Sequence, residues 1–434
     1  MRIKFNKSTG SPATGLRRRS GLGQLLLVAA ASLGVATLMT ACSQLTATLT
    51  VDFVYVTSAK AAGPDNYGQV DVFEINSESG HMRQIPTSPF PSGGRNPVAE
   101  AVSSDNTNLY VVNEDDNTIV QFIIGSDGKL YPQNTANTPG VFPLAVSVAK
   151  NYLFVADTYQ PLATCSPASP CSGSVAVFPI EPAAGSQQAG TLQLHTSINT
   201  CNGLEYLPLA IPGAGGHVVT PTAVNATSNG ANLFVSAVDA TATPKRGYLF
   251  AYSLGTIDCG NKVANPTLTP LPGSPFAAGV QPSSLASDPS GTYVYATDSA
   301  TATILGYAIG ASGLTPPSGN PFPTGNQPAS IVIDATGKFA MVAEAQDSSV
   351  STYAINGGAL NRIASFATGV QPVAVGIDPN MNRYIYTANF LGNNVSGFAL
   401  DSNSGSLVNT QFSPFAANAN PTAVAAIPHK GSKN

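Results

Sequence analysis

Apolar residues in this chain form short runs that alternate with polar positions, and the same order of runs recurs along most of its length. A proline is followed by an apolar run such as 329–333, then by a turn rich in Asp, Pro and Gly such as 334–337. A second run such as 385–389 comes next, and a third run alternates between apolar and polar residues. Alternation with β-branched and aromatic enrichment predicts β-strands, and such turns favour tight hairpins. Each unit therefore predicts antiparallel strands in chain order.

Seven prolines begin these units, and their spacing defines the repeat. They are Pro97, Pro143, Pro221, Pro282, Pro328, Pro372 and Pro421, with intervals of 46, 78, 61, 46, 44 and 49 residues. A period near 45 residues is typical of propeller blades with four short strands each. The two long intervals predict loop insertions in the third and fourth blades. The pattern predicts an all-β fold, a seven-bladed β-propeller over residues 51–428, followed by a tail, 429–434.

The first unit lacks its opening strand, and the end of the chain supplies a strand with no unit after it. Residues 422–427 read Thr-Ala-Val-Ala-Ala-Ile. We expect this strand to complete the first blade, because closing the ring pairs edges that would otherwise be exposed. The third strands place one aromatic at a fixed position, which predicts packing between blades: Phe73, Phe122, Phe178, Tyr252, Tyr307, Tyr353 and Phe398.

The first 41 residues have the features of an export signal. They contain six basic residues and no acidic one, and an apolar run from Leu25 to Met39. That run is shorter than the ~20 residues that span a bilayer. The segment Leu38-Met39-Thr40-Ala41-Cys42 resembles the lipobox of bacterial lipoproteins. We expect a lipoprotein signal peptide over 1–41, lipid attachment at Cys42 and a short linker over 42–50; an ordinary signal peptide is the alternative.

Charge and cysteine content narrow the class of protein further. Of 19 Lys and Arg residues, six lie before Cys42, so 13 remain against 23 acidic residues, a formal charge of −10. An acidic chain without a basic cluster argues against nucleic acid as a partner. Four further cysteines in an exported chain favour disulfides, and of three possible pairings we favour Cys165–Cys171 with Cys201–Cys259. Metal binding is the alternative, but no CxxC spacing supports it.

The second strands, of Tyr-Val-x-Asn type, carry a family resemblance. Leu109-Tyr110-Val111-Val112-Asn113 and Ile385-Tyr386-Thr387-Ala388-Asn389 are two of seven, and the chain has no Trp, which WD40 repeats require. Together with the Asp-Pro-x-Gly turns, they resemble the YVTN/lactonase-like seven-bladed propellers, which include 6-phosphogluconolactonases. The resemblance implies the fold over residues 51–428. It also implies, for an active lactonase, His and Arg with a carboxylate near one mouth of the channel.

The catalytic part of that resemblance is incomplete in this sequence. The opening strands contain no His, and we expect the four histidines, at 81, 195, 217 and 429, in loops or on the surface. Glu114 follows Val111-Val112-Asn113, a segment similar to one of the family's. Glu100 occupies a position that holds Val, Leu or Ile in the other opening strands. A carboxyl in an apolar position needs a partner or an altered pKa. Glu100 therefore either forms a salt bridge, for example to Arg95, or is a functional residue.

The ends of the second strands emerge on one face, because blades repeat by rotation. They include Asn113, Asp157, Asp298, Glu344 and Asn389. Side-chain oxygens at such positions commonly cap turns. An acidic rim that faces a ligand is the alternative, and no DxDxDG-like run supplies a Ca²⁺ site. We expect no metal and no cofactor.

Two functions of different classes fit these observations. The first is a propeller anchored at the cell envelope by its lipid, monomeric, that binds a protein, peptide or glycan through its loop faces. The second is a lactonase-like hydrolase. Intact blades without the family's histidines favour the first, and Glu100 and Glu114 are the catalytic candidates for the second.

Overall fold

The computed structural model describes residues 50–182, 189–213, 215–378 and 383–429. The predicted signal peptide, Cys42 and the linker up to residue 49 lie outside the described residues. In the described part of the chain, no helix has the length and apolar character needed to cross a membrane.

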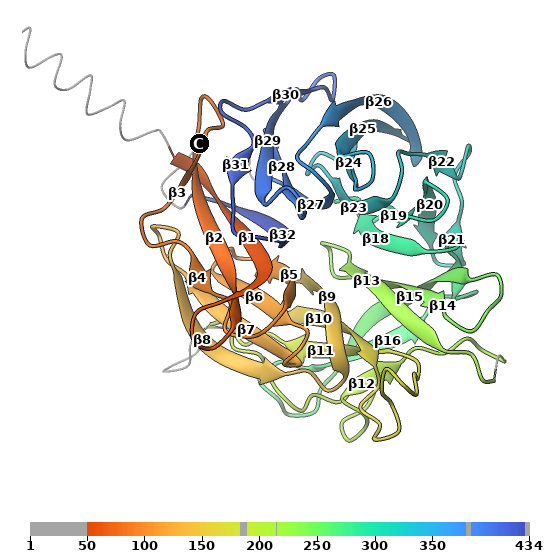
Figure 1. Ribbon diagram of the computed structural model, residues 1–434. Coiled ribbons are helices and arrows are strands. Elements are labelled where there is room, and N and C mark those ends of the chain that lie inside the picture. The colour runs from red at the N-terminus through yellow and green to blue at the C-terminus, as the bar shows by residue number, and fades with distance from the viewer. Residues whose placement is uncertain (1–49, 183–188, 214, 379–382, 430–434) are drawn as a thin grey trace, which may run out of the picture. The chain divides into compact units, whose positions relative to one another are not determined.

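Seven antiparallel sheets form a closed ring, as Figure 1 shows. The first three blades consist of β32 (Pro421–Pro428) with β1 (Thr50–Ala62), β2 (Tyr67–Asn76), β3 (Met82–Gln84) and β4 (Phe90–Pro91); of β5 (Pro97–Val102), β6 (Asn108–Asn113), β7 (Thr118–Ile124) and β8 (Leu130–Asn137); and of β9 (Val141–Ala149), β10 (Tyr152–Tyr159), β11 (Ser174–Pro179) and β12 (Tyr206–Pro208).

The other four blades follow the same order. They consist of β13 (Val219–Ala226), β14 (Asn232–Asp239), β15 (Arg246–Ile257), β16 (Asn265–Pro270) and β17 (Phe276–Ala277); of β18 (Pro282–Ser287), β19 (Tyr293–Asp298), β20 (Thr303–Gly310), β21 (Gly313–Thr315) and β22 (Phe322–Pro323); of β23 (Pro328–Ile333), β24 (Phe339–Glu344), β25 (Ser349–Asn356) and β26 (Ala359–Ala367); and of β27 (Pro372–Ile377), β28 (Tyr384–Asn389), β29 (Asn394–Leu400), β30 (Leu407–Asn409) and β31 (Phe415–Ala416).

The predicted closure is confirmed. Strand β32 pairs antiparallel with β1, from Asp52 opposite Pro428 to Ser58 opposite Pro421. The first blade thus takes its innermost strand from the end of the propeller and its other strands from the start. Pairing on both sides of β1 removes an exposed edge.

The hydrophobic core consists of separate clusters between neighbouring blades and not of one central cluster. The seven third-strand aromatics are buried, and each belongs to a different apolar cluster built from two neighbouring blades. Phe73, for example, packs with Tyr384 and Tyr386 across the junction of the first and last blades. This arrangement confirms the predicted role of these aromatics. Burial of large apolar side chains at every junction holds the ring together.

The second strands add a polar tie at several of these junctions. The hydroxyl of Tyr55 donates to the carbonyl oxygen of Gly128 in the next blade, at 3.1 Å. Tyr110 and Tyr295 make the equivalent bond to the carbonyl oxygens of residues 190 and 358. A buried phenol needs such an acceptor, because an unpaired hydroxyl away from water is costly.

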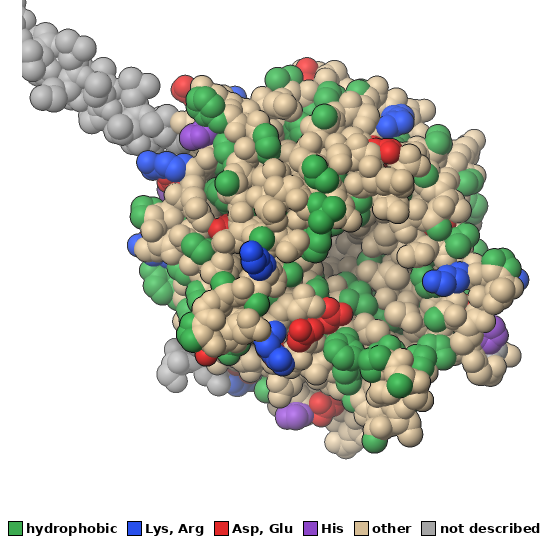
Figure 2. All heavy atoms as spheres, in the orientation of Figure 1, with side chains coloured by type: hydrophobic (Ala, Val, Ile, Leu, Met, Phe, Trp, Pro, Cys, Tyr) green, Lys and Arg blue, Asp and Glu red, His purple; other side chains and the backbone are tan. Residues whose placement is uncertain are grey.

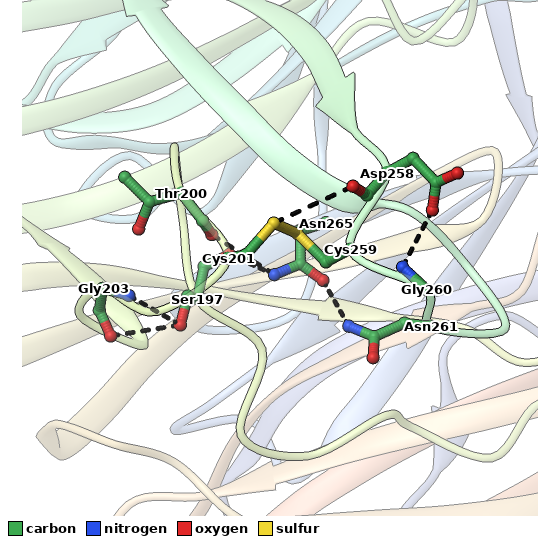
Figure 3. The surroundings of a disulfide bond; sticks show 9 residues. All are labelled: Ser197, Thr200, Cys201, Gly203, Asp258, Cys259, Gly260, Asn261 and Asn265. Atoms are coloured by element: carbon green, nitrogen blue, oxygen red, sulfur yellow. Dashed lines mark hydrogen bonds between the residues drawn. A yellow bond between two sulfur atoms is a disulfide. The ribbon is translucent and has the colours of Figure 1, made fainter.

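Both favoured disulfides are present, and the two insertions carry them. Cys165–Cys171 closes the loop between β10 and β11, and Cys201–Cys259 joins the third blade's insertion to the β15–β16 loop of the fourth. Figure 3 shows the second bridge, beside which the Asn265 side chain donates to the carbonyl oxygens of Ser197 and Thr200. The third blade's insertion is therefore tied to the fourth blade by a covalent bond and by hydrogen bonds.

Candidate functional site

A channel runs through the ring where the seven innermost strands approach one another. Its cavity has a volume of about 310 Å³, and residues from β5, β9, β13, β18, β23, β27 and β32 line it. Figure 2 shows the hollow at the middle of one face, with acidic side chains beside it. The volume lies at the lower end of the ~300–1,000 Å³ common for small-molecule sites.

The channel wall is made almost entirely of small, uncharged side chains. Ser, Thr, Asn, Ala, Val, Leu and Ile residues form it, and Glu100 is the one ionisable residue among the described residues that line it. Several hydroxyls bond the protein itself: Ser284 and Ser330 each accept from the backbone N–H of the next blade. The wall is thus polar enough to be wet, and its charge is concentrated on a single carboxyl.

Glu100 lies on β5, and its side chain enters the junction between the first two blades. Its position is the one that holds buried aliphatic side chains elsewhere, such as Leu285 and Ile331. Thr57 Oγ1 on β1 donates to Glu100 Oε2, at 2.5 Å, whereas Oε1 is buried with no hydrogen-bond donor. Burial raises the pKa of Glu100 to about 7, although the bonds from Thr57 and the Ala425 backbone N–H lower it.

The suggested salt bridge between Glu100 and Arg95 is wrong. Arg95 lies in the loop before β5, and its Nε donates to Asp116 Oδ1 at 2.7 Å. Its backbone N–H bonds the same carboxylate. Arg95 therefore fastens two loops together at the surface, and Glu100 is left with hydroxyl and amide donors only.

Glu114, the second catalytic candidate, lies in the loop after β6 and not among the residues that line the channel. Asn96 Nδ2 donates to Glu114 Oε2 at 2.8 Å. Partial burial raises the pKa of Glu114, as does the neighbouring Asp115. Since Val111 is the residue opposite Glu100, Glu114 lies three residues, or roughly 10 Å of strand, further along. The fold does not bring the two carboxyls together.

The five ligand-facing candidates at the ends of the second strands are all buried. Asp298 accepts from the backbone N–H groups of Val280 and Gln281, and Glu344 accepts from the backbone N–H of Gly325 and from the Ser349 hydroxyl. The Asn389 and Asn113 side chains donate to Ser and Thr hydroxyls of the adjacent strand. The oxygens of Asp298 and Glu344 thus hold loop backbone groups, which is the capping role expected at these positions, whereas Asn113 and Asn389 act through their amide N–H groups.

Asp157 differs from its equivalents in the other blades. Neither of its carboxyl oxygens has a hydrogen-bond donor in the geometry described, and a side chain on Gly140 would collide with it. Burial raises the pKa of Asp157 to about 7, and nearby groups of Thr138 and Gly140 lower it.

Sequence reasoning missed a pair of buried carboxyls at the ring closure. Asp52 on β1 and Asp378 after β27 are 1% and 0% exposed and lie within hydrogen-bond reach of each other. Neither oxygen of Asp52 has a donor. Burial, and then the charge of Asp378, raise the pKa of Asp52 to about 8. The Tyr386 hydroxyl beside them is also buried without a hydrogen-bond partner. The position of Asp52, directly before the apolar run 53–56, was the feature of the sequence that could have indicated a buried carboxyl.

The histidines stand apart from the channel. His195 and His217 bond the carboxylates of Glu205 and Asp239, and His81 and His429 contact aromatic rings. None of the four is among the described residues that line the channel. Within the described ranges, no three His, Cys, Asp or Glu side chains come together in a way that would hold a metal ion.

Comparison with known proteins gives a consistent result. The profile of the family "Lactonase, 7-bladed beta-propeller" matches residues 53–203 and 240–425. A provisionally named 6-phosphogluconolactonase of Bacteroides fragilis has a similar structure, with a TM-score of 0.66 and 18% identity over 87% of this chain and 98% of its own. The periplasmic gluconolactonase of Pseudomonas aeruginosa has a TM-score of 0.60 and 18% identity over 87% and 98%. At this identity the structures show a shared fold. No curated protein matches the sequence.

Proposed function

Because the chain belongs to the lactonase family of seven-bladed β-propellers, we propose that it hydrolyses an uncharged lactone in its central channel, with Glu100 as the general base. The observation that carries this proposal is the position of Glu100. It is the one ionisable side chain among the described residues that line the channel, and one of its oxygens has no protein donor.

The composition of the wall argues for an uncharged substrate. An anionic group, such as the phosphate of 6-phosphogluconolactone, is normally bound by Arg, Lys or a helix N-terminus. No Lys, Arg or His is among the described lining residues, and Glu100 would repel an anion when ionised. A neutral, hydroxyl-rich lactone meets no such penalty, since hydroxyl and amide groups of the wall match it.

The chemistry follows from a carboxyl that titrates near neutral pH. Ionised Glu100 accepts a proton from water as the water oxygen attacks the lactone carbonyl, which forms a tetrahedral intermediate. When the bond from the carbonyl carbon to the ring oxygen breaks, Glu100 returns the proton to the leaving alkoxide, and a hydroxy acid is released. A base with a pKa of about 7 combines a useful ionised fraction with adequate basicity.

The test is hydrolysis of glucono-δ-lactone by the purified protein, followed by pH-stat titration and corrected for spontaneous opening. We expect the rate to rise with pH through about 7. Glu100→Gln should lower kcat by ~10²-fold or more, in keeping with the loss of a general base. Glu114→Gln is the matched control and should retain activity. Equal rates for wild type and Glu100→Gln would refute the assignment, and faster turnover of 6-phosphogluconolactone would refute the preference for uncharged substrates.

The second candidate function is binding without chemistry, through the channel or the loop faces, by a monomeric propeller at the cell envelope. The observation in its favour is that neither His nor Arg accompanies Glu100 in the described channel wall. A binding measurement made beside the hydrolysis assay separates the two. Saturable binding of a lactone, peptide or glycan without turnover favours a binding protein, and turnover that depends on Glu100 favours the hydrolase.

Export and lipid anchoring at Cys42 are also part of the proposal. Support comes from the lipobox-like segment before Cys42 and from two disulfides, which belong to oxidising compartments. We expect bacterial cells expressing the full chain to incorporate a palmitate analogue into it, and the Cys42→Ser variant to remain unlabelled. Equal labelling of both would contradict the anchor.

A further inference from the structure

The Thr57 hydroxyl that donates to Glu100, and the Ala425 backbone N–H that lowers the pKa of Glu100, come from the two strands whose pairing closes the ring. Thr57 lies on β1, the first strand of the propeller, and Ala425 lies on β32, the last. Glu100 itself belongs to the second blade. The channel carboxyl is therefore held by side-chain and backbone groups that are brought together only when residues far apart in sequence pair.

A further bond ties the closing strand to the strand that carries Glu100. Thr422 Oγ1 on β32 lies 3.2 Å from the carbonyl oxygen of Thr57 and 2.9 Å from that of Pro97, the first residue of β5. The hydroxyl thus bridges the first blade and the start of the Glu100 strand. These contacts fix how β1 and β5 sit relative to each other, and hence where Thr57 meets Glu100.

We propose that Thr57 is the positioning residue of the channel carboxyl and that ring closure completes the site. The Thr57 hydroxyl fixes Oε2 against the first blade, and Oε1 is left buried without a protein donor. This inference rests on the proposed function for its catalytic consequence. Its structural consequence, the effect of Thr57 on Glu100, stands without it.

The same strand position in another blade provides a matched control. Thr297 on β19 is equivalent to Thr57, and its Oγ1 lies 2.8 Å from the Ser283 hydroxyl rather than near a carboxyl. Both threonines are fully buried. Replacing either by valine removes one buried hydroxyl next to the channel, but only the change at Thr57 removes a donor to Glu100.

The groups around Glu100 allow its own titration to be measured. Tyr55, on β1, is the neighbour whose pKa the charge of Glu100 raises, and its hydroxyl is bonded to Gly128. The donors on β1 and β32 are a hydroxyl and a backbone N–H, which do not titrate in this range. A change in the titration of Glu100 in the Thr57 variants therefore reports on the lost donor.

The experiment follows the Glu100 carboxyl by ¹³C NMR in full-length protein labelled at glutamate, with Glu100→Gln to assign the resonance. A hydrogen bond to an ionised group is worth about one pH unit or more, so Thr57→Val should raise the midpoint by about one pH unit. Thr57→Ser, which keeps the hydroxyl, and Thr297→Val should titrate like the wild type. Thr57→Ala serves as the second variant if valine disturbs folding.

Hydrolysis measured in parallel separates this inference from the proposed function. The acid limb of the kcat profile should move with the NMR midpoint in Thr57→Val, with KM changed less than twofold. An NMR shift without hydrolysis by any form would support the positioning role and refute the lactonase. An unchanged midpoint in folded Thr57→Val or Thr57→Ala protein would overturn the positioning role, whatever the activity.

Discussion

The buried carboxyl pair at the ring closure makes the stability of the protein depend on pH in an unusual direction. Asp52 and Asp378 lie beside each other away from water, so the folded protein favours a proton on Asp52. The perturbation that tests this is Asp52→Asn, because the amide preserves the shape of the side chain. The amide also donates a hydrogen bond to Asp378 at every pH.

The magnitude follows from the pKa of Asp52, about 8 in the folded protein against 3.8 for the ordinary carboxyl. The folded protein binds the proton more tightly, so this group's full contribution is present below pH 3.8 and is lost progressively as pH rises to about 8. Each tenfold change in proton affinity corresponds to about 1.4 kcal/mol, so the loss of stability has an upper bound of about 6 kcal/mol. The Asp52→Asn variant has no such titrating group, so its free energy of unfolding should not fall in this way.

The assay is urea unfolding of wild type and Asp52→Asn at intervals from pH 4 to 9, followed by tyrosine fluorescence and circular dichroism. The two midpoints should be similar near pH 4 and should diverge as pH rises, with the variant the more stable. Asp116→Asn is the control: this surface carboxylate bonds Arg95, which lowers its pKa, so its removal should not change the alkaline limb. Parallel pH dependence of wild type and Asp52→Asn would refute the reasoning.

Three further outcomes are expected from variants elsewhere in the ring. Cys259→Ser should lower the free energy of unfolding by about 4 kcal/mol, since the bridge to Cys201 spans 58 residues, with reducing agent removing the difference from wild type. Tyr386→Phe should leave the thermal midpoint unchanged or raise it, because its hydroxyl lacks a partner, whereas Tyr295→Phe should cost about 1 kcal/mol with the loss of its bond to Gly358. Removing β32 should expose the edge of β1, which light scattering would detect as aggregation and limited proteolysis as cleavage within the first blade.

The architecture was predictable from the sequence because every blade repeats the same local rules. Alternation defined the strands, Asp-Pro-x-Gly turns defined the hairpins, and the unpaired segment 422–427 defined the closure. The fixed aromatic of each third strand, Tyr353 among them, is buried where the pattern placed it. These features depend on residues close in sequence or, for the closure, on the single pairing of β32 with β1.

The site was only partly predictable, because it depends on contacts between distant residues. Glu100 was identified as an exception in an apolar position, and it does line the channel. The salt bridge to Arg95, five residues away, was one of two alternatives for it and does not form, since the donor to Glu100 is Thr57 in another blade. The sequence predicted that the acidic residues at the strand ends share a face. It did not indicate that loop N–H groups bond the carboxylates of Asp298 and Glu344. The Asp52–Asp378 contact joins opposite ends of the propeller, and no local pattern indicates it.

The pairing of β32 with β1 has a consequence for how the chain can be cut and rejoined. Asp52 lies opposite Pro428, so the two ends of the described propeller lie side by side in the first blade. A short peptide between these ends would give a continuous chain, and new termini opened in the exposed turn near Gly357, in the sixth blade, would then leave every strand pairing intact. In the folded state the ring has no obligatory first blade. A chain that began at another blade could therefore close the same ring.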